Sequence, residues 1–312
     1  FNHLKIHSQY SICEGAVKID ELAEFCKKNR VPSVGISDTS NLCGALEFSE
    51  TLSKSGTQPI IGSQINFKYK NELGLLPVIA KTRKGYKNII ELSSSSYLDN
   101  TNLSLPHCKL DNLLNNGNDI IVLSGSINGL IGKLFDKGKF QEISEIYTFL
   151  KKNFKDDFYI EIQRHNDHNE KNFEKFNLKK SSDLDIPIIA TNEVFYIDKN
   201  MYEAHDALTC IGNKTYINEK NRIKYSNQHY LKTDEEMKKL FFDIPESLEN
   251  NYNLVFKCNF RPAFSEPILP NISSEKGGNA DEILTRDSKD GLKNKFLKIL
   301  KPTLSESERK EK

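Results

Sequence analysis

Short apolar runs alternate with amphipathic segments along the first 190 residues of the chain. An apolar run with β-branched residues is typical of a strand, whereas apolar residues spaced three and four apart are typical of a helix. The predicted strands are residues 3–6, 34–37, 59–67, 75–80, 119–123, 158–162 and 186–190. The predicted helices are residues 19–28, 45–54, 86–95, 138–153 and 170–182. This alternation predicts parallel βα units, in an α/β barrel or a doubly wound sheet, and the strand number favours a barrel.

The pattern changes after residue 200. Short helices are predicted at 202–210, 234–240 and 244–256, and Thr233 with Glu236 forms a capping box before the second of them. Prolines and a Gly-Gly pair at 261–278 indicate a linker. The chain is therefore divided into a domain at 1–260, a linker at 261–280 and a segment at 281–312. We expect the striped helix 281–300 to belong to a following domain; the alternative is that it folds back on the first.

Composition excludes several functional classes. Lys+Arg of 44 against Asp+Glu of 43 gives a net charge of +1, so no global basic field points to DNA binding. No apolar run approaches the roughly 20 residues of a membrane helix, and no signal peptide opens the chain. The six cysteines are scattered without a C-x-x-C pair, which predicts reduced thiols in a cytoplasmic protein. Because the chain opens at Phe1 and closes in a charged run, we expect a piece of a longer protein.

Side chains that bind metals or phosphate follow several predicted strands. His3, Lys5 and His7 share one face of the first strand, and Glu14 lies in the loop after it. In α/β barrels, sites are built from the loops at the carboxyl ends of the strands. Residues at other such positions are Asp38, Gln64, Ser124, Ser126, Glu161, Gln163, Arg164, His165, Thr191, Asn192 and Glu193. If they converge they supply the His and carboxylate ligands of a divalent ion; the alternative is a buried strand whose histidines only form hydrogen bonds.

Motifs along the whole chain resemble a known family. They lie in Phe1–Gly15 and at residues 37–44, 59–62, 85–88, 122–125, 190–194, 203–206 and 243–248. In order and spacing they are similar to the PHP (polymerase and histidinol phosphatase) domain, in the version found at the N-terminus of bacterial DNA polymerase III alpha subunits. The resemblance implies an α/β fold with a distorted (βα)7 barrel, followed by a linker and the start of the polymerase palm.

The resemblance also implies a metal-binding cleft, most of which is altered here. His7, Asp38 and His165 keep the family's residue, and Glu14 and Glu193 keep an acid. The family's His or acid is replaced at five further positions, by Lys5, Thr39, Gln64, Leu75 and Phe195. We therefore expect a degenerate cleft that holds no metal, with a single ion at His7, His165 and Glu193 left open. Lys5 is expected to form a salt bridge with Glu14 or Glu193, and Phe195 to fill the space with an apolar ring.

The function implied by the resemblance is a non-catalytic scaffold in a DNA-directed DNA polymerase of DNA replication. Its partners would be the proofreading exonuclease subunit, the other polymerase domains of the same chain, and DNA through the holoenzyme. Nucleotidyl transfer would need carboxylates that hold Mg²⁺ beyond Lys312. The alternatives are an active metal-dependent phosphoesterase (3′–5′ exonuclease or pyrophosphatase) and a free-standing small-molecule phosphatase. A basic loop either contacts DNA phosphates or is solvated: Lys214, Lys220, Arg222 and Lys224.

Overall fold

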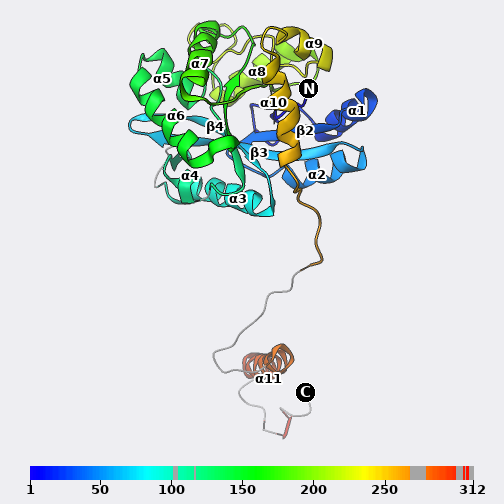
Figure 1. The fold of residues 1–312 in the computed structure, drawn as a ribbon. Helices are drawn as coiled ribbons and strands as arrows, with labels where there is room; N and C mark the ends of the chain where they lie inside the picture. The colour runs from blue at the N-terminus through cyan, green and yellow to red at the C-terminus, as the bar shows by residue number, and fades with distance from the viewer. Residues whose placement is uncertain (101–104, 116, 268–278, 300–304, 306, 309–312) are drawn as a thin grey trace. The chain divides into compact units, whose positions relative to one another are not determined.

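A computed structural model describes residues 1–100, 105–115, 117–267, 279–299, 305 and 307–308 of the 312. The chain divides into two compact units, Phe1–Ala263 and Phe264–Lys312. The first unit is an α/β domain in which helices surround a curled sheet (Figure 1).

The sheet has nine strands in the described part of the chain, and its path runs β8-β7-β6-β4-β3-β2-β1-β9, with β5 paired to β3. In chain order the strands are β1 (Lys5–Ile6), β2 (Ser33–Thr39), β3 (Gln58–Tyr69), β4 (Glu72–Ala80), β5 (Cys108–Lys109), β6 (Ile120–Leu123), β7 (Phe158–Ile162), β8 (Ile188–Ala190) and β9 (Glu193–Val194). The seven predicted strands are all present. The short strands β5 and β9 were not predicted from the sequence.

One strand departs from the predicted parallel order. β4 is antiparallel to both β3 and β6, because β3 and β4 form a hairpin in which Tyr69 pairs with Glu72. Only Lys70 and Asn71 lie between these partners, and Lys70 has a φ of 52°, as tight hairpin turns require. A parallel crossover needs a dozen or more residues. The hairpin is therefore the physical cause of the distorted barrel.

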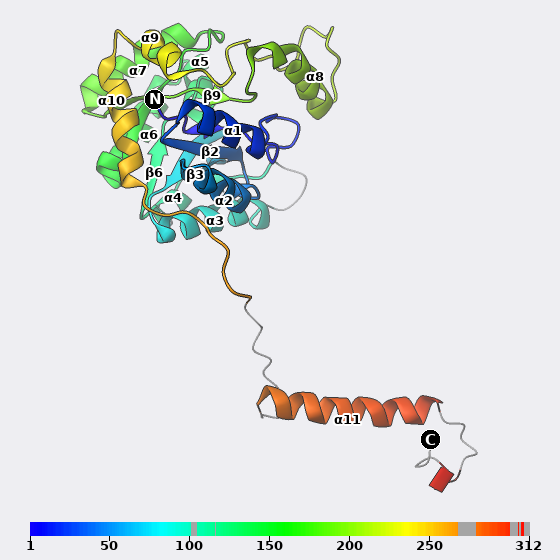
Figure 2. The same ribbon diagram turned by 90° about the vertical axis from the view of Figure 1, so that its right-hand side faces the viewer.

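The helices cover the outside of the sheet (Figures 1 and 2). They are α1 (Ile19–Asn29), α2 (Ala45–Lys54), α3 (Arg83–Leu98), α4 (Asn112–Asn115), α5 (Leu130–Asp136), α6 (Phe140–Phe154), α7 (Glu170–Leu184), α8 (Tyr202–Asn213), α9 (Asp234–Leu240) and α10 (Pro245–Leu254). The largest apolar cluster joins the sheet to α3, α5 and α6 through residues such as Leu92, Ile131 and Ile146. The helices pack on the outer face of the sheet, and the site residues lie at the carboxyl ends of the parallel strands.

A side chain from α10 bridges the gap between the two ends of the sheet. The end strands β8 and β9 are separated in the chain only by Thr191 and Asn192. Asn251 is fully buried there, and its Nδ2 donates to the carbonyls of Asn2 (2.8 Å) and Ala190 (3.1 Å). Its Oδ1 accepts the backbone N–H of Asn2 (2.8 Å). Asn251 thus ties the segment before β1 to the end of β8, where no strand pairing joins them.

The predicted capping box at the start of α9 is present. Thr233 Oγ1 accepts the Glu236 N–H (3.2 Å), and the Glu236 carboxylate accepts the Thr233 N–H (2.7 Å). Thr233→Ala is expected to lower the free energy of unfolding by about 1 kcal/mol, because one helix N–H loses its acceptor. Urea denaturation measures this change. Thr148→Ala is the matched control, since the exposed Thr148 hydroxyl only donates to a carbonyl within α6; a loss as large there would contradict the capping argument.

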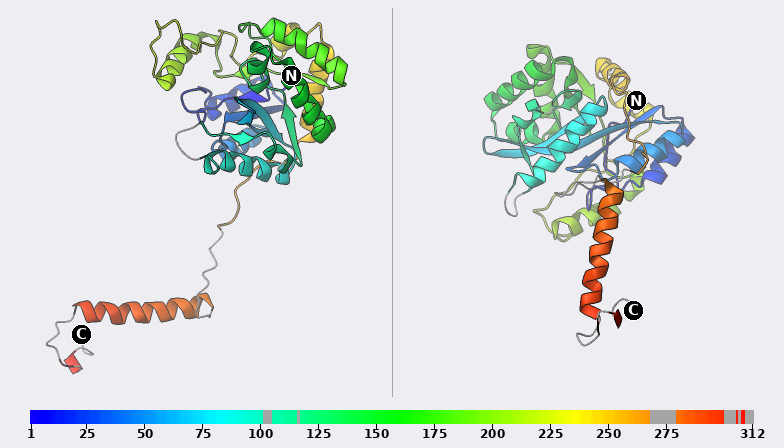
Figure 3. Two further views of the ribbon diagram at one scale, coloured as in Figure 1. Left: turned by 90° about the vertical axis from the view of Figure 1, so that its left-hand side faces the viewer. Right: turned by 90° about the horizontal axis from the view of Figure 1, so that it is seen from below.

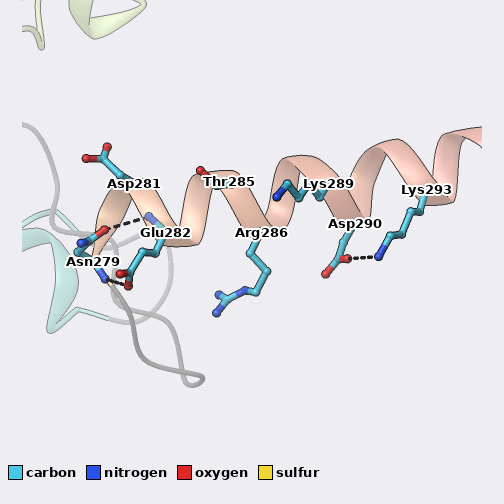
Figure 4. A pocket seen from close by; sticks show the side chains of 8 residues that line it. All are labelled: Asn279, Asp281, Glu282, Thr285, Arg286, Lys289, Asp290 and Lys293. Atoms are coloured by element: carbon cyan, nitrogen blue, oxygen red, sulfur yellow. Dashed lines mark hydrogen bonds and ion pairs between the residues drawn. The ribbon is translucent and has the colours of Figure 1, made fainter.

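The second unit contains one long helix, α11 (Ala280–Ile299), which Figure 3 also shows. Asn279 caps it, since its Oδ1 accepts the Glu282 N–H (2.9 Å) and its own N–H donates to the Glu282 carboxylate (3.1 Å). A hollow along this helix is lined only by Asn279 and side chains of α11 (Figure 4). A single helix has no second wall that encloses a ligand, so no site is assigned there. None of the helices described is long and apolar enough to span a bilayer.

Candidate degenerate metal cleft

The Lys5 ammonium lies at the centre of the candidate site. Its side chain is completely buried, and Nζ is 3.0 Å from Glu161 Oε1 and 3.6 Å from Glu193 Oε2. β1 pairs with β9 so that Lys5 lies directly opposite Glu193. Burial alone would lower the pKa of Lys5, but the two carboxylates outweigh it and raise that pKa above its usual value. The salt bridge to Glu193 agrees with the sequence-based hypothesis, whereas Glu161, and not Glu14, is the second partner.

His7 contacts the same Glu193 carboxylate as Lys5. Its Nε2 is 3.1 Å from Glu193 Oε1 and 2.8 Å from the amide nitrogen of Gln64, which also donates to Glu193 Oε1 (2.6 Å). Burial alone would lower the pKa of His7, but Glu14 and Glu193 raise it. Burial alone would raise the pKa of Glu193, but Lys5 and His7 hold it well below its usual value. Lys5, His7 and Gln64 therefore all lie against the Glu193 carboxylate at the centre of the cleft.

Asp38 is occupied by the loop that follows β1. Its carboxylate accepts the Ser8 N–H, the Ser8 hydroxyl and the Ser11 hydroxyl, each at 2.7 Å. Thr39 Oγ1 donates to Glu14 Oε2 (2.5 Å), and that oxygen is 3.9 Å from His7 Nδ1. Asp38 thus fixes the loop after β1. Glu14 is held by the Thr39 hydroxyl at a longer distance from His7 than Glu193 is.

An aromatic cluster fills the space beside His7. The Phe195 ring is 1% exposed and lies 4.6 Å, between ring centroids, from both His7 and Tyr225. It also stacks on His205, with centroids 5.3 Å apart. His205 Nε2 in turn contacts the carbonyl of Glu14 (2.7 Å), so its role is hydrogen bonding. Phe195 excludes water and ligands from the side of the cleft where its ring lies.

His165 belongs to a neighbouring buried group. Its Nε2 accepts the Glu193 N–H (3.2 Å), and its ring stacks on His229 with centroids 4.1 Å apart. Burial, His229 and Lys232 together lower the pKa of His165 well below its usual value. His229, which no sequence motif marked as a site residue, contacts the Glu193 carbonyl (3.1 Å) and Asp167 (3.4 Å). His165 Nε2 is thus already engaged, with the Glu193 N–H and with Asn192 Oδ1 at 3.1 Å.

Comparisons with known proteins agree with these observations. Residues 3–165, about half of the chain, match the PHP domain family. The chain belongs to the PHP domain family. It is 34% identical over 301 residues to the DNA polymerase III subunit alpha of Caulobacter vibrioides, covering 94% of this chain and 26% of that protein. The corresponding subunit of Rickettsia conorii is 33% identical over 296 residues, with coverages of 94% and 25%.

The chain spans about a quarter of the length of these curated relatives. Among solved structures, a putative metal-dependent phosphoesterase from Bifidobacterium adolescentis aligns at 12% identity with a TM-score of 0.41, over 62% of this chain and 86% of that one.

In the part of the chain that the structure describes, the PHP metal positions do not gather into a cluster of metal ligands. Among the residues that the structure describes, no group of three or more His, Cys, Asp and Glu side chains is arranged to hold a metal. Leu75 lies opposite Asn66 in the β3–β4 hairpin, and so on the same face as Gln64, where it offers no ligand atom. The ammonium of Lys5 stands among the remaining carboxylates. The donor set at these positions therefore does not fit a metal cluster.

One of the four predicted DNA-contacting residues, Arg222, forms an ion pair with an acid of the same chain. Arg222 forms two hydrogen bonds with the Asp206 carboxylate, at 2.6 and 2.7 Å, and its side chain is 4% exposed. Its guanidinium holds the pKa of Asp206 below the usual value. The Arg222 guanidinium is therefore engaged within the protein, and its contact with DNA stays a prediction. Lys214, Lys220 and Lys224 are exposed, and their contact with DNA stays a prediction.

Arg222→Gln is expected to loosen residues 214–225 while leaving the barrel folded. Arg222 also donates to the carbonyls of Ile217 (3.2 Å) and Ile223 (3.3 Å), so its loss frees the loop from α8. Thermolysin cleavage within the loop should accelerate about tenfold, because local opening controls proteolysis. Lys220→Gln, at an exposed position in the same loop, is the matched control. Equal cleavage rates for both variants would contradict this role.

Proposed function

We propose that this chain is the PHP domain of a replicative DNA polymerase III alpha subunit and that it is a non-catalytic scaffold. The observation that carries the proposal is the Lys5 ammonium, buried between Glu161 and Glu193 at the centre of the former metal cleft. Metal-assisted phosphoester hydrolysis needs an ion that polarises the phosphoryl oxygen and activates water. A fixed side-chain cation neutralises the carboxylates without offering an open coordination position.

The scaffold role follows from how the cleft is filled. The ion pairs of Lys5 and the ring of Phe195 convert a ligand site into buried structure. In the proposed parent protein, nucleotidyl transfer and its Mg²⁺ belong to other domains of the longer chain. This domain would stabilise them and dock the proofreading exonuclease subunit. The resemblance to polymerase III alpha subunits over 94% of this chain supports that assignment.

Metal analysis and hydrolysis assays on the purified 312-residue chain test the proposal. After dialysis against Mn²⁺ or Zn²⁺, we expect less than stoichiometric metal and no hydrolysis of bis(p-nitrophenyl) phosphate or 3′-labelled DNA. Primer extension with Mg²⁺ should also be absent, since the proposal places that chemistry in other domains. Stoichiometric metal with hydrolysis that His7→Gln abolishes would establish the active phosphoesterase instead. The matched control is His168→Gln, which changes an exposed histidine outside the cleft.

A further inference from the structure

Helix α8 and the loop after it stand out from the side of the barrel, as Figures 2 and 3 show. We call residues 202–225 the α8 projection. It contacts the domain through the loop that follows β1. A Cβ at Gly212 would lie 2.6 Å from the Cβ of Cys13, and His205 contacts the Glu14 carbonyl. The projection is therefore anchored on the elements that build the cleft.

The loop of the projection is held in one conformation by the partly buried Arg222–Asp206 pair. Arg222 binds Asp206 of α8 with two hydrogen bonds and the carbonyls of Ile217 and Ile223 with two more. At its other end the loop is fixed to α8 by the Tyr202 hydroxyl, which donates to the Tyr225 carbonyl (3.3 Å). A surface that is ordered before binding loses less entropy when a partner docks.

The ordered loop presents large apolar side chains to solvent. Five residues of the projection and the adjacent β1 loop are each more than half exposed: Ile12, Ile211, Tyr216, Ile217 and Ile223. Scattered apolar residues are normal on a surface, but a gathering of this kind on one projecting element is typical of an interaction site. Arg222 fixes the backbone of two of these isoleucines, Ile217 and Ile223, through their carbonyls.

The charges around these side chains indicate what would cover them. Asp206 neutralises the charge of Arg222. The loop then has three exposed lysines and one acid, Glu219, whose carboxylate accepts the Tyr216 N–H (3.0 Å). These lysines are Lys214, Lys220 and Lys224. A surface for single-stranded nucleic acid would pair such lysines with aromatic rings for base stacking. Four of the five apolar residues here are isoleucines, which pack well against other aliphatic side chains and do not stack on bases.

We propose that the α8 projection is a protein-docking surface for a partner segment that carries aliphatic side chains flanked by carboxylates. The partner's aliphatic groups cover Ile217 and Ile223, and its carboxylates face Lys220 and Lys224. This inference rests on the docking role proposed above, and it names the surface and the chemistry of the partner. It replaces DNA as the occupant of the basic loop.

Binding of the purified cognate exonuclease subunit to the 312-residue chain tests the surface. We expect Ile217→Ser with Ile223→Ser to weaken binding at least about tenfold, as the loss of two central interface residues does. Lys220→Glu with Lys224→Glu should also weaken binding and reduce its dependence on salt. The matched control is Leu98→Ser, which removes an apolar side chain of α3 that is 81% exposed and should leave binding unchanged. Isothermal titration calorimetry at two salt concentrations measures all four proteins.

Each other outcome rejects a distinct statement. If the wild-type chain binds the exonuclease subunit and the Ile217/Ile223 variant binds equally well, the surface is wrong and the docking role stands. If the wild-type chain does not bind that subunit, both the docking role and the surface are wrong. The metal analysis and hydrolysis assays then still test separately whether the cleft is non-catalytic. A fluorescein-labelled single-stranded oligonucleotide forms the second arm. Loss of oligonucleotide binding in the lysine variant, with exonuclease binding intact, would assign the loop to DNA.

Discussion

Lys5→Met is expected to lower the free energy of unfolding by about 4 kcal/mol, since removing one partner of a buried ion pair leaves an uncompensated charge. Methionine keeps an unbranched side chain as far as the position of the lysine Cε, so the loss measures mainly the removal of the ammonium. Glu161 would then lose the ammonium 3.0 Å from its carboxylate, and Glu193 would keep only His7 and Gln64 as side-chain partners. Glu161 retains the Gln163 amide and the Thr191 hydroxyl as donors, which limits the loss. Urea denaturation at neutral pH measures it.

The difference in the free energy of unfolding between the wild type and Lys5→Met should become smaller as the pH falls. In the wild-type domain the pKa of Glu193 is held below its ordinary value of 4.5, so its stabilising contribution is present above pH 4.5 and is lost as the pH falls through the lowered pKa. In the variant, burial without Lys5 raises that pKa, and protonation then relieves the buried charge. Lys18→Met, at an exposed lysine paired with Glu21, is the control and should change stability little. A Lys5→Met protein as stable as the wild type at neutral pH would show that the ion pair is not needed.

Asn251→Ala is expected to lower the free energy of unfolding by about 3 kcal/mol, because it removes three hydrogen bonds and leaves buried backbone groups unpaired. The affected groups are the N–H and carbonyl of Asn2 and the carbonyl of Ala190. These are the atoms that join the start of β1 to the end of β8. Thermal and urea denaturation measure the loss, and hydrogen exchange should show the Asn2 amide among the most affected.

Asn253→Ala provides the control for this prediction. It removes the same side chain from the same helix at an exposed position, so the change in helix propensity is matched. A similar loss in both variants would mean that α10, and not the bridge, is responsible. An Asn251→Ala domain with unchanged exchange at Asn2 would likewise contradict the role of Asn251 at the seam.

Much of the fold is readable in the sequence because most of its elements are set locally. The predicted bounds of α2, α9 and β7 agree with the structure, since each combines a clear apolar period with flanking polar residues. The direction of β4 could not be predicted from its apolar run, which looks the same in either orientation. The turn at Lys70 and Asn71 decides it, and this turn lacks the glycine that usually marks a hairpin. β9 has only two residues and is defined by pairing with β1.

The candidate site was predictable as a list of residues but not as a set of contacts. His7, Gln64 and Glu193 were selected as residues at strand ends, and the barrel brings them together. The pairing of Lys5 with Glu161 joins residues 156 positions apart in the chain, counted from 5 to 161, and depends on how far the sheet curls. His229 lies outside the helices and strands and carries no motif, so nothing in its sequence surroundings indicated that it stacks on His165. Asp38 matched the family pattern, and its use by two serines became visible only in the loop geometry.

The bridge made by Asn251 also constrains when the domain can form. Asn2 and Asn251 are 249 positions apart, so nearly the whole domain must leave the ribosome before the two ends of the sheet are joined. Contacts between residues so distant in the chain close late and slow folding, because the entropy of the intervening loop is lost first. Until then, β8 exposes an unpaired edge during synthesis, which is where association with another nascent chain would begin.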